Sequence, residues 1–198
     1  MICKPIKKTV GRVSGTWGFT LIETLLAISV LTVSIMGPLT IASRGLNAAL
    51  MAKNKTVAFY LAQDAIEFVR YKRDSNTLNS QLWLTGLESC ISSDGAIACK
   101  ISSISKTIDG CGAGCPVLNF DSSTHIFSYD AVGGTIAPTI FTRRVLIKTP
   151  VGIGCPGGVK CNDEQTEAEV KIEVSWKDFG RQVTPHVITV QENIFNWQ

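Results

Sequence analysis

Polar and apolar residues divide the start of the chain into distinct stretches. Residues 1–18 contain four basic side chains and no acidic one, and an apolar run follows. Between Glu23 and Arg44 the chain has 20 consecutive uncharged residues, about the length of helix that crosses the hydrocarbon core of a bilayer. The pattern predicts a membrane-spanning helix over residues 19–43, with the carboxylate of Glu23 at one end. An ionised carboxylate in such a helix is costly, so we expect it to have a partner.

Residues 44–75 are predicted to continue this helix as an amphipathic segment. Apolar residues recur there at spacings of three, four or seven, and charged residues take most of the other faces. No Gly or Pro occurs between Leu46 and Leu78. The polar run Asp74-Ser75-Asn76 is expected to end the helix. Trp83, in the connection that follows, is interpreted as a small core anchor or as an exposed contact.

Residues 76–198 are predicted to form a β-rich head. The clearest strand covers residues 168–176, where five apolar or small residues alternate with charged or polar ones. Further strands are expected at residues 98–108, 125–132, 139–148 and 182–195, the last after a turn at Gly180. Short links between successive strands favour an antiparallel meander, with one face against the helix and the other partly solvated. The predicted fold class is α+β.

Seven cysteines add a constraint on the head. Cys3 lies in the N-terminal stretch, and the other six lie beyond the apolar run, where an even count suggests disulfides. The simplest pairing joins sequence neighbours: Cys90 with Cys99, Cys111 with Cys115, and Cys155 with Cys161. Six cysteines allow 15 pairings, so this pairing is a preference. A zinc site using Cys111 and Cys115 is the alternative. We expect no metal and no cofactor.

The distribution of charge argues against a nucleic-acid partner. The net charge of the chain is +3, but residues 1–18 carry four of the 19 basic residues and none of the 16 acidic ones. The remaining 15 basic and 16 acidic residues give a net charge near −1. Because the basic excess precedes the apolar run, it favours an N-terminus that stays on the cytoplasmic side.

The junction between the basic stretch and the apolar run reads Gly18-Phe19-Thr20-Leu21-Ile22-Glu23. It resembles the N-terminal processing motif of type IV pilins and of type II secretion pseudopilins: a short basic leader, Gly, Phe-Thr-Leu-(Ile/Val)-Glu, and an apolar helix. The stretch of residues 60–76 is similar to the corresponding helix of minor pilins and minor pseudopilins. The resemblance implies a long N-terminal helix whose second half packs on the β-sheet of the head.

The resemblance also implies a processing and assembly pathway. A prepilin peptidase would cleave between Gly18 and Phe19 and N-methylate the new Phe19 terminus. Glu23, then the fifth residue, would pair with the N-terminal amine of a neighbouring subunit. A buried carboxylate is tolerable when a cation meets it in this way. The expected partners are the peptidase, other pilin or pseudopilin subunits, and the membrane.

These implications divide the chain into a leader (1–18), a transmembrane assembly helix (19–43), an amphipathic helix half (44–75) and a head (76–198). The subunit is expected in the cytoplasmic membrane as a single-pass protein before assembly. Afterwards it is expected in an extracytoplasmic pilus or pseudopilus. Gly37-Pro38 predicts a kink near residues 34–37, because proline lacks a helical N–H and clashes with the preceding turn. This kink is interpreted either as a bend used in fibre packing or as a tolerated membrane proline.

Two alternatives to a minor pilin remain at this point. A minor type II secretion pseudopilin has the same subunit chemistry. A membrane-anchored binding module, stapled by disulfides, would not polymerise at all. We expect no enzymatic activity: the sequence has no Gly-x-Ser-x-Gly elbow and no glycine-rich phosphate loop. His125 and His186 fall in strand candidates and are interpreted as structural. An acidic stretch at residues 163–169 is interpreted as a solvated turn rather than a calcium loop.

Overall fold

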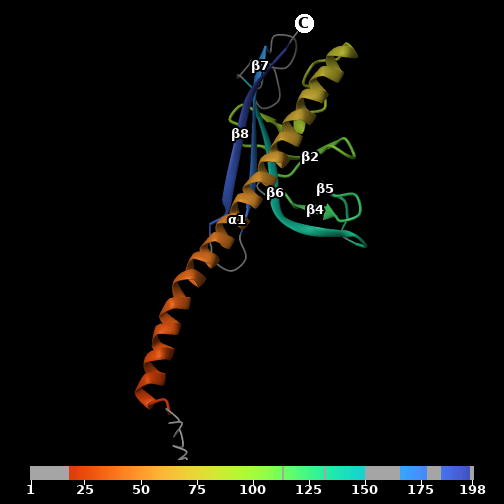
Figure 1. The fold of residues 1–198 in the computed structure, drawn as a ribbon. Helices are drawn as coiled ribbons and strands as arrows, with labels where there is room; N and C mark the ends of the chain where they lie inside the picture. Colours follow the sequence, from red (N-terminus) through yellow and green to blue (C-terminus); the bar gives the residue numbers. More distant parts are fainter. Residues whose placement is uncertain (1–17, 113, 132, 150–165, 178–183, 197–198) are drawn as a thin grey trace, which may run out of the picture. The chain divides into compact units, whose positions relative to one another are not determined.

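The computed structural model describes residues 18–112, 114–131, 133–149, 166–177 and 184–196. The chain divides into two compact units, Met1–Leu50 and Met51–Gln198. The first unit contributes the first part of a long helix, α1 (Leu21–Leu78), and the second contributes the rest of α1 and the head. The second part of α1 packs against a mainly antiparallel sheet (Figure 1), which is the predicted α+β class.

Helix α1 is continuous over its 58 residues. Pro38 lies inside it and does not end it, so the kink predicted at Gly37-Pro38 stays a prediction. By length and composition, α1 is the one helix of the described residues that could cross a membrane. In the first unit, every described side chain is exposed.

Helix α1 ends at Leu78, two residues beyond the predicted end at Asp74-Ser75-Asn76. The side chain of Asn76 is buried and stabilises the helical conformation there. The Asn76 amide donates hydrogen bonds to the carbonyls of Trp83 (3.1 Å) and Thr85 (2.8 Å). The helix then closes with a Schellman motif. In this motif the N–H of Gln81 bonds to the Asn76 carbonyl (2.8 Å) and the N–H of Ser80 bonds to the Thr77 carbonyl (3.1 Å). Ser80 occupies the left-handed position, with φ 53°.

The head contains a short 3₁₀ helix, η1 (Glu88–Cys90), and one sheet of eight strands among the described residues. The strands are β1 (Ile91–Ser92), β2 (Ala98–Ser102), β3 (Thr107–Gly110), β4 (Val117–Asp121), β5 (Ile126–Ser128), β6 (Ile136–Lys148), β7 (Glu167–Trp176) and β8 (His186–Phe195). The longest of them, β6, pairs with β1, β2, β4 and β7. The meander prediction therefore holds only for β6, β7 and β8, which lie side by side in that order (Figure 1).

The region before β6 differs most from the sequence prediction. Residues 98–108 were predicted as one strand but form the hairpin β2–β3, with Lys106 in a left-handed conformation. Strand β4 was not predicted. Of the strand predicted at residues 125–132, the described residues 125–131 contain only the three-residue strand β5, because His125 (φ 61°) belongs to the turn between β4 and β5. Serine-rich and short segments of this kind carry too little apolar alternation to indicate where a strand turns.

The core lies between the second part of α1 and one face of the sheet. On β7, the alternate residues Ala168, Val170, Ile172, Val174 and Trp176 are all buried, as the alternation predicted. The helix contributes Ala58, Leu61, Ala62, Ala65, Ile66, Phe68 and Val69 to the same cluster. Trp83 is also buried there, which confirms its interpretation as a core anchor.

Candidate functional site

The N-terminal end of α1 forms the candidate assembly segment. Gly18, Phe19 and Thr20 are exposed and precede the helix. The hydroxyl of Thr20 accepts a hydrogen bond from the backbone N–H of Glu23 (3.3 Å). The backbone carbonyl of Thr20 accepts one from the backbone N–H of Thr24 (3.2 Å). Thr20 is therefore the N-cap of α1. Sequence reasoning missed this role, although Thr20-x-x-Glu23 is the spacing of a capping box.

Glu23 lies in the first turn of α1 and is exposed. A carboxylate at this position interacts favourably with the helix macrodipole and with the unpaired N–H groups of the first turn. The geometry thus gives Glu23 an intramolecular role in starting the helix. It also leaves the carboxylate at the surface, where another chain can reach it.

Hydroxyl groups in the apolar part of α1 bond to the helix itself. Each donates to a backbone carbonyl three or four residues earlier, at distances of 2.7–2.9 Å. The donors are Thr24, Ser29, Thr32, Ser34, Thr40 and Ser43. Side chains satisfied in this way need no outside partner, so the helix can face lipid or another helix without leaving these polar groups unpaired.

Proline changes the hydrogen bonding at one point of this helix. Pro38 has no N–H, so the carbonyl of Ser34 lacks its usual helical donor. The hydroxyl of Thr40 donates to the carbonyl of Met36 (2.8 Å), next to this site. The segment around Pro38 therefore holds fewer backbone hydrogen bonds than the rest of the helix.

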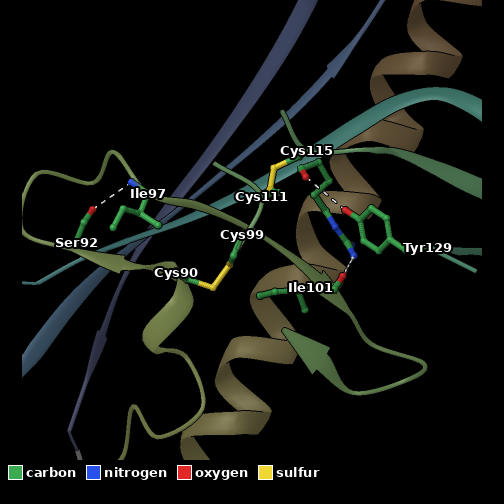
Figure 2. Close-up of a disulfide and its surroundings, with 9 residues drawn as sticks. Cys90, Ser92, Ile97, Cys99, Ile101, Cys111, Cys115 and Tyr129 are labelled. Carbon is green, nitrogen blue, oxygen red and sulfur yellow. Dashed lines mark hydrogen bonds between the residues drawn. A yellow bond between two sulfur atoms is a disulfide. The ribbon is translucent and has the colours of Figure 1, made fainter. Parts of the chain in front are cut away.

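In the described part of the head, two disulfides link neighbouring segments of the chain (Figure 2). Cys90 at the end of η1 bonds to Cys99 on β2, and Cys111 bonds to Cys115. Both join sequence neighbours, the pairing that the sequence analysis preferred. The sulfurs of Cys111 and Cys115 are therefore not thiolates that could hold zinc. Cys155 and Cys161 lie outside the described residues.

A buried arginine connects three elements of the head. Arg143 on β6 is 2% exposed and donates to the Leu61 carbonyl (2.9 Å), the Asp64 carboxylate (2.7 Å) and the Ile101 carbonyl (2.6 Å). The hydroxyl of Tyr129 donates to the Arg143 carbonyl (3.4 Å). Figure 2 shows Ile101 and Tyr129 beside this site. Burial raises the pKa of the Tyr129 hydroxyl.

A second ion pair joins α1 to the last strand. The guanidinium of Arg70 bonds to both carboxylate oxygens of Glu192 on β8 (2.6 Å each) and to Glu67 (2.6 Å). Its hydrogen bond to Glu192 raises the pKa of Arg70 above its ordinary value. The two charged contacts of α1 with the sheet thus have opposite polarity: Asp64 meets a cation of the sheet, and Arg70 meets an anion.

The structure does not bring the two histidines together into a site. His125 packs against Phe120 in the turn between β4 and β5, and His186 stacks on Trp176 at the start of β8. Glu167 and Glu169 lie on β7, while Asp163 and Glu164 lie outside the described residues. Among the residues that the structure describes, no group of three or more His, Cys, Asp or Glu could hold a metal ion.

Comparison of the chain with family models, with curated proteins and with solved structures finds no match.

Proposed function

We propose that this chain is a minor type IV pilin-like subunit. A prepilin peptidase cleaves it after Gly18 and N-methylates Phe19. The mature chain then assembles through its N-terminal helix into a pilus or pseudopilus. The observation that carries the proposal is the processing-type motif at residues 18–23, which spans the start of a capped, exposed helix long enough to cross a bilayer.

Three features of the helix support the proposal. The hydroxyls bond within the helix, so its surface suits lipid and close helix packing. Thr20 starts the helix two residues after the proposed cleavage site, so removal of residues 1–18 leaves the cap in place. The one carboxylate of the apolar stretch, Glu23, lies at the end where the new amine of Phe19 would form.

In the proposed filament, the carboxylate of Glu23 pairs with the α-amine of Phe19 of a neighbouring subunit. Two opposite charges attract far more strongly in a helix bundle than in water, because the dielectric constant there is low. The pair also removes the cost of leaving either charge alone inside the bundle. Assembly is thereby coupled to cleavage, because only a cleaved subunit carries this amine.

The intact mass of the full chain, co-expressed with a prepilin peptidase, tests the proposal. We expect a mature chain that begins at Phe19 and carries one additional methyl group. The same expression without the peptidase is the control and should leave residues 1–18 in place. An uncleaved chain, under conditions in which a known prepilin is cut, would contradict the proposal. The membrane-anchored binding module would then be the better account of the disulfide-stapled head.

A further inference from the structure

The two described disulfides of the head differ in their exposure to solvent. Cys90 and Cys99 are 0% exposed, whereas Cys111 and Cys115 are partly exposed. The described residues between the outer pair are glycines 112 and 114, which are exposed, and a Cβ added to either would meet nothing within 4 Å. A thiolate breaks a disulfide by reaching one of its sulfur atoms, so access favours attack on Cys111–Cys115.

The fold itself holds the two sulfurs of the inner disulfide together. Cys99 lies on β2 and pairs with Gly110 of β3 on one side and with Val145 of β6 on the other. Cys90 ends η1, and its N–H donates to the Leu87 carbonyl (2.9 Å). These contacts do not depend on the S–S bond, so two thiols at these positions would meet at a high effective concentration. The disulfide is therefore strongly favoured over the dithiol.

The outer disulfide closes a loop that lies between two strands. The N–H of Cys111 donates to the Ala98 carbonyl (2.9 Å), and the N–H of Gly114 donates to the Cys111 carbonyl (3.0 Å). Cys115 lies outside β4, which begins at Val117. Opening the bond returns backbone freedom to the glycines of the loop, and this gain in entropy favours the dithiol.

The two disulfides lie on opposite faces of the β2–β3 hairpin. Cys99 is opposite Gly110, and Cys111 follows Gly110 directly, so its side chain points to the other face. Figure 2 shows the two bonds as separate pairs of sulfur atoms. Cys90 and Cys99 belong to the core cluster of the described residues, and the outer pair does not. Opening the outer bond therefore frees the connection between β3 and β4 and leaves the core closed.

We propose that Cys111–Cys115 is a thiol–disulfide exchange site of the folded head, labile because its loop is exposed and rich in glycine. The reagent it takes is a thiolate, from a small thiol or from a dithiol protein. The thiolate forms a bond to one sulfur, and the electron pair of the old S–S bond leaves on the other cysteine, which takes up a proton. A second thiolate attacks the added sulfur and releases the first cysteine as a thiol. Two thiols are thereby oxidised to a disulfide while Cys111 and Cys115 are reduced.

The exchange site is independent of the proposed function, because it needs neither cleavage nor assembly. The test uses the full chain in detergent micelles, equilibrated with reduced and oxidised glutathione at stepped ratios or with reduced and oxidised thioredoxin. Free thiols are alkylated, and the remaining disulfides are then reduced and alkylated with a heavy reagent. Trypsin separates the two bonds, because Lys100 and Lys106 lie between them: peptide 74–100 contains the inner pair and peptide 107–143 the outer pair.

We expect peptide 107–143 to be reduced at a lower ratio of squared reduced glutathione to oxidised glutathione than peptide 74–100. The two midpoints should differ by at least about tenfold, or about 30 mV. Near-ultraviolet circular dichroism should show that the head stays folded at the first midpoint. A mixed disulfide with glutathione on peptide 107–143 assigns a small thiol as the reagent, and reduction by thioredoxin alone assigns a dithiol protein.

A matched pair of variants tests the role of the loop. Gly114→Ala meets no neighbour within 4 Å and lowers the freedom of the open loop, so it should shift the midpoint of peptide 107–143 about two- to fivefold toward the disulfide. Gly45→Ala, which also meets no neighbour, is the control and should leave that midpoint unchanged.

Four results would overturn the proposal. They are equal midpoints for the two peptides, earlier reduction of peptide 74–100, no reduction of peptide 107–143 by either reagent while the head is folded, and easier reduction of that peptide in Gly114→Ala. Loss of the folded signal together with reduction of peptide 107–143 would overturn it as well, because the exchange would then require unfolding.

Discussion

The hydroxyl of Thr20 accepts a hydrogen bond from the backbone N–H of Glu23, at 3.3 Å. This contact makes Glu23 the third helical position of a capped helix, where either Glu or Gln serves. Pairing with an amine, in contrast, requires the charge of a carboxylate. The capping and pairing roles of Glu23 can therefore be separated by substitutions that differ in charge alone.

Glu23→Gln is predicted to keep the helix start and to abolish assembly. We expect membrane insertion and cleavage after Gly18 close to those of the unmodified chain. Incorporation into filaments should fall by more than about tenfold, because an unpaired buried charge costs several kcal/mol and each 1.4 kcal/mol is a factor of ten. Filament fractions and membrane fractions are compared by quantitative immunoblotting.

The matched variants change the cap instead of the charge. Thr20→Ser keeps a hydroxyl at the N-cap and should behave as the unmodified chain does. Thr20→Ala should weaken the helix start by about 1 kcal/mol without removing the charge of Glu23. If Glu23→Gln assembles normally, the carboxylate of Glu23 has no role in pairing with the amine of a neighbouring subunit.

Ser80→Gly is predicted to stabilise the head. Ser80 has φ 53° at the end of α1, a conformation that costs a residue with a Cβ roughly 1–2 kcal/mol and costs glycine little. Part of the gain is offset by the greater freedom of glycine in the unfolded chain. The free energy of unfolding in urea should rise by about 0.5–1 kcal/mol. Thr77→Gly, at an exposed helical position nearby, should not raise it.

The two described disulfides are predicted to contribute unequally. Cys90–Cys99 closes nine residues of sequence and Cys111–Cys115 closes four. In the chain-entropy account, the longer loop contributes roughly 2.5–3 kcal/mol and the shorter roughly 2. Cys90 and Cys99 are also fully buried, so their double alanine variant loses packing as well. Urea unfolding measures the loss of unfolding free energy in each double alanine variant. An equal loss in the two variants, or a larger loss for the variant without Cys111–Cys115, would contradict the prediction.

Asp121 is predicted to make the stability of the head depend on pH. Hydrogen bonds from Thr135 and then from Ser123 lower the pKa of its carboxyl. Because the pKa is lower in the folded state, the stabilisation is complete above about pH 4 and is lost as the pH falls through the folded pKa. Asp121→Asn removes this contribution. The urea midpoints of the unmodified chain and of Asp121→Asn should therefore move closer together below about pH 4. Plots of the two midpoints against pH that stay parallel from pH 6 to 2 would contradict this.

Sequence pattern predicted the regular parts of the fold. The strands at 139–148 and 168–176 were found because side chains of β6 and β7 alternate between a buried and a more exposed face. The long helix was found because apolar residues recur at helical spacing. For Trp83 the sequence left a core anchor and an exposed contact as alternatives, and its burial decides for the core anchor.

The parts that were missed depend on contacts between distant residues. The extension of the helix to Leu78 depends on Asn76 and on carbonyls of a later loop, and the sequence does not show that such carbonyls are close. The hairpin β2–β3 depends on a serine-containing turn in which Lys106, and not a glycine, has the left-handed conformation. No local pattern in the sequence marks Arg143 as a buried residue. Its burial depends on Asp64, which is 79 residues away.

The pairing of β6 with four other strands has a consequence for the order of folding. The hairpins β2–β3 and β4–β5 precede β6 in the chain, and isolated two-stranded hairpins are at best marginally stable in water. During synthesis from the N-terminus, the two hairpins have no strand that joins them into one sheet until β6, residues 136–148, has been made. We expect a head truncated before β6 to bind chaperones and to be degraded rapidly, whereas one that extends through β7 begins to show cooperative structure.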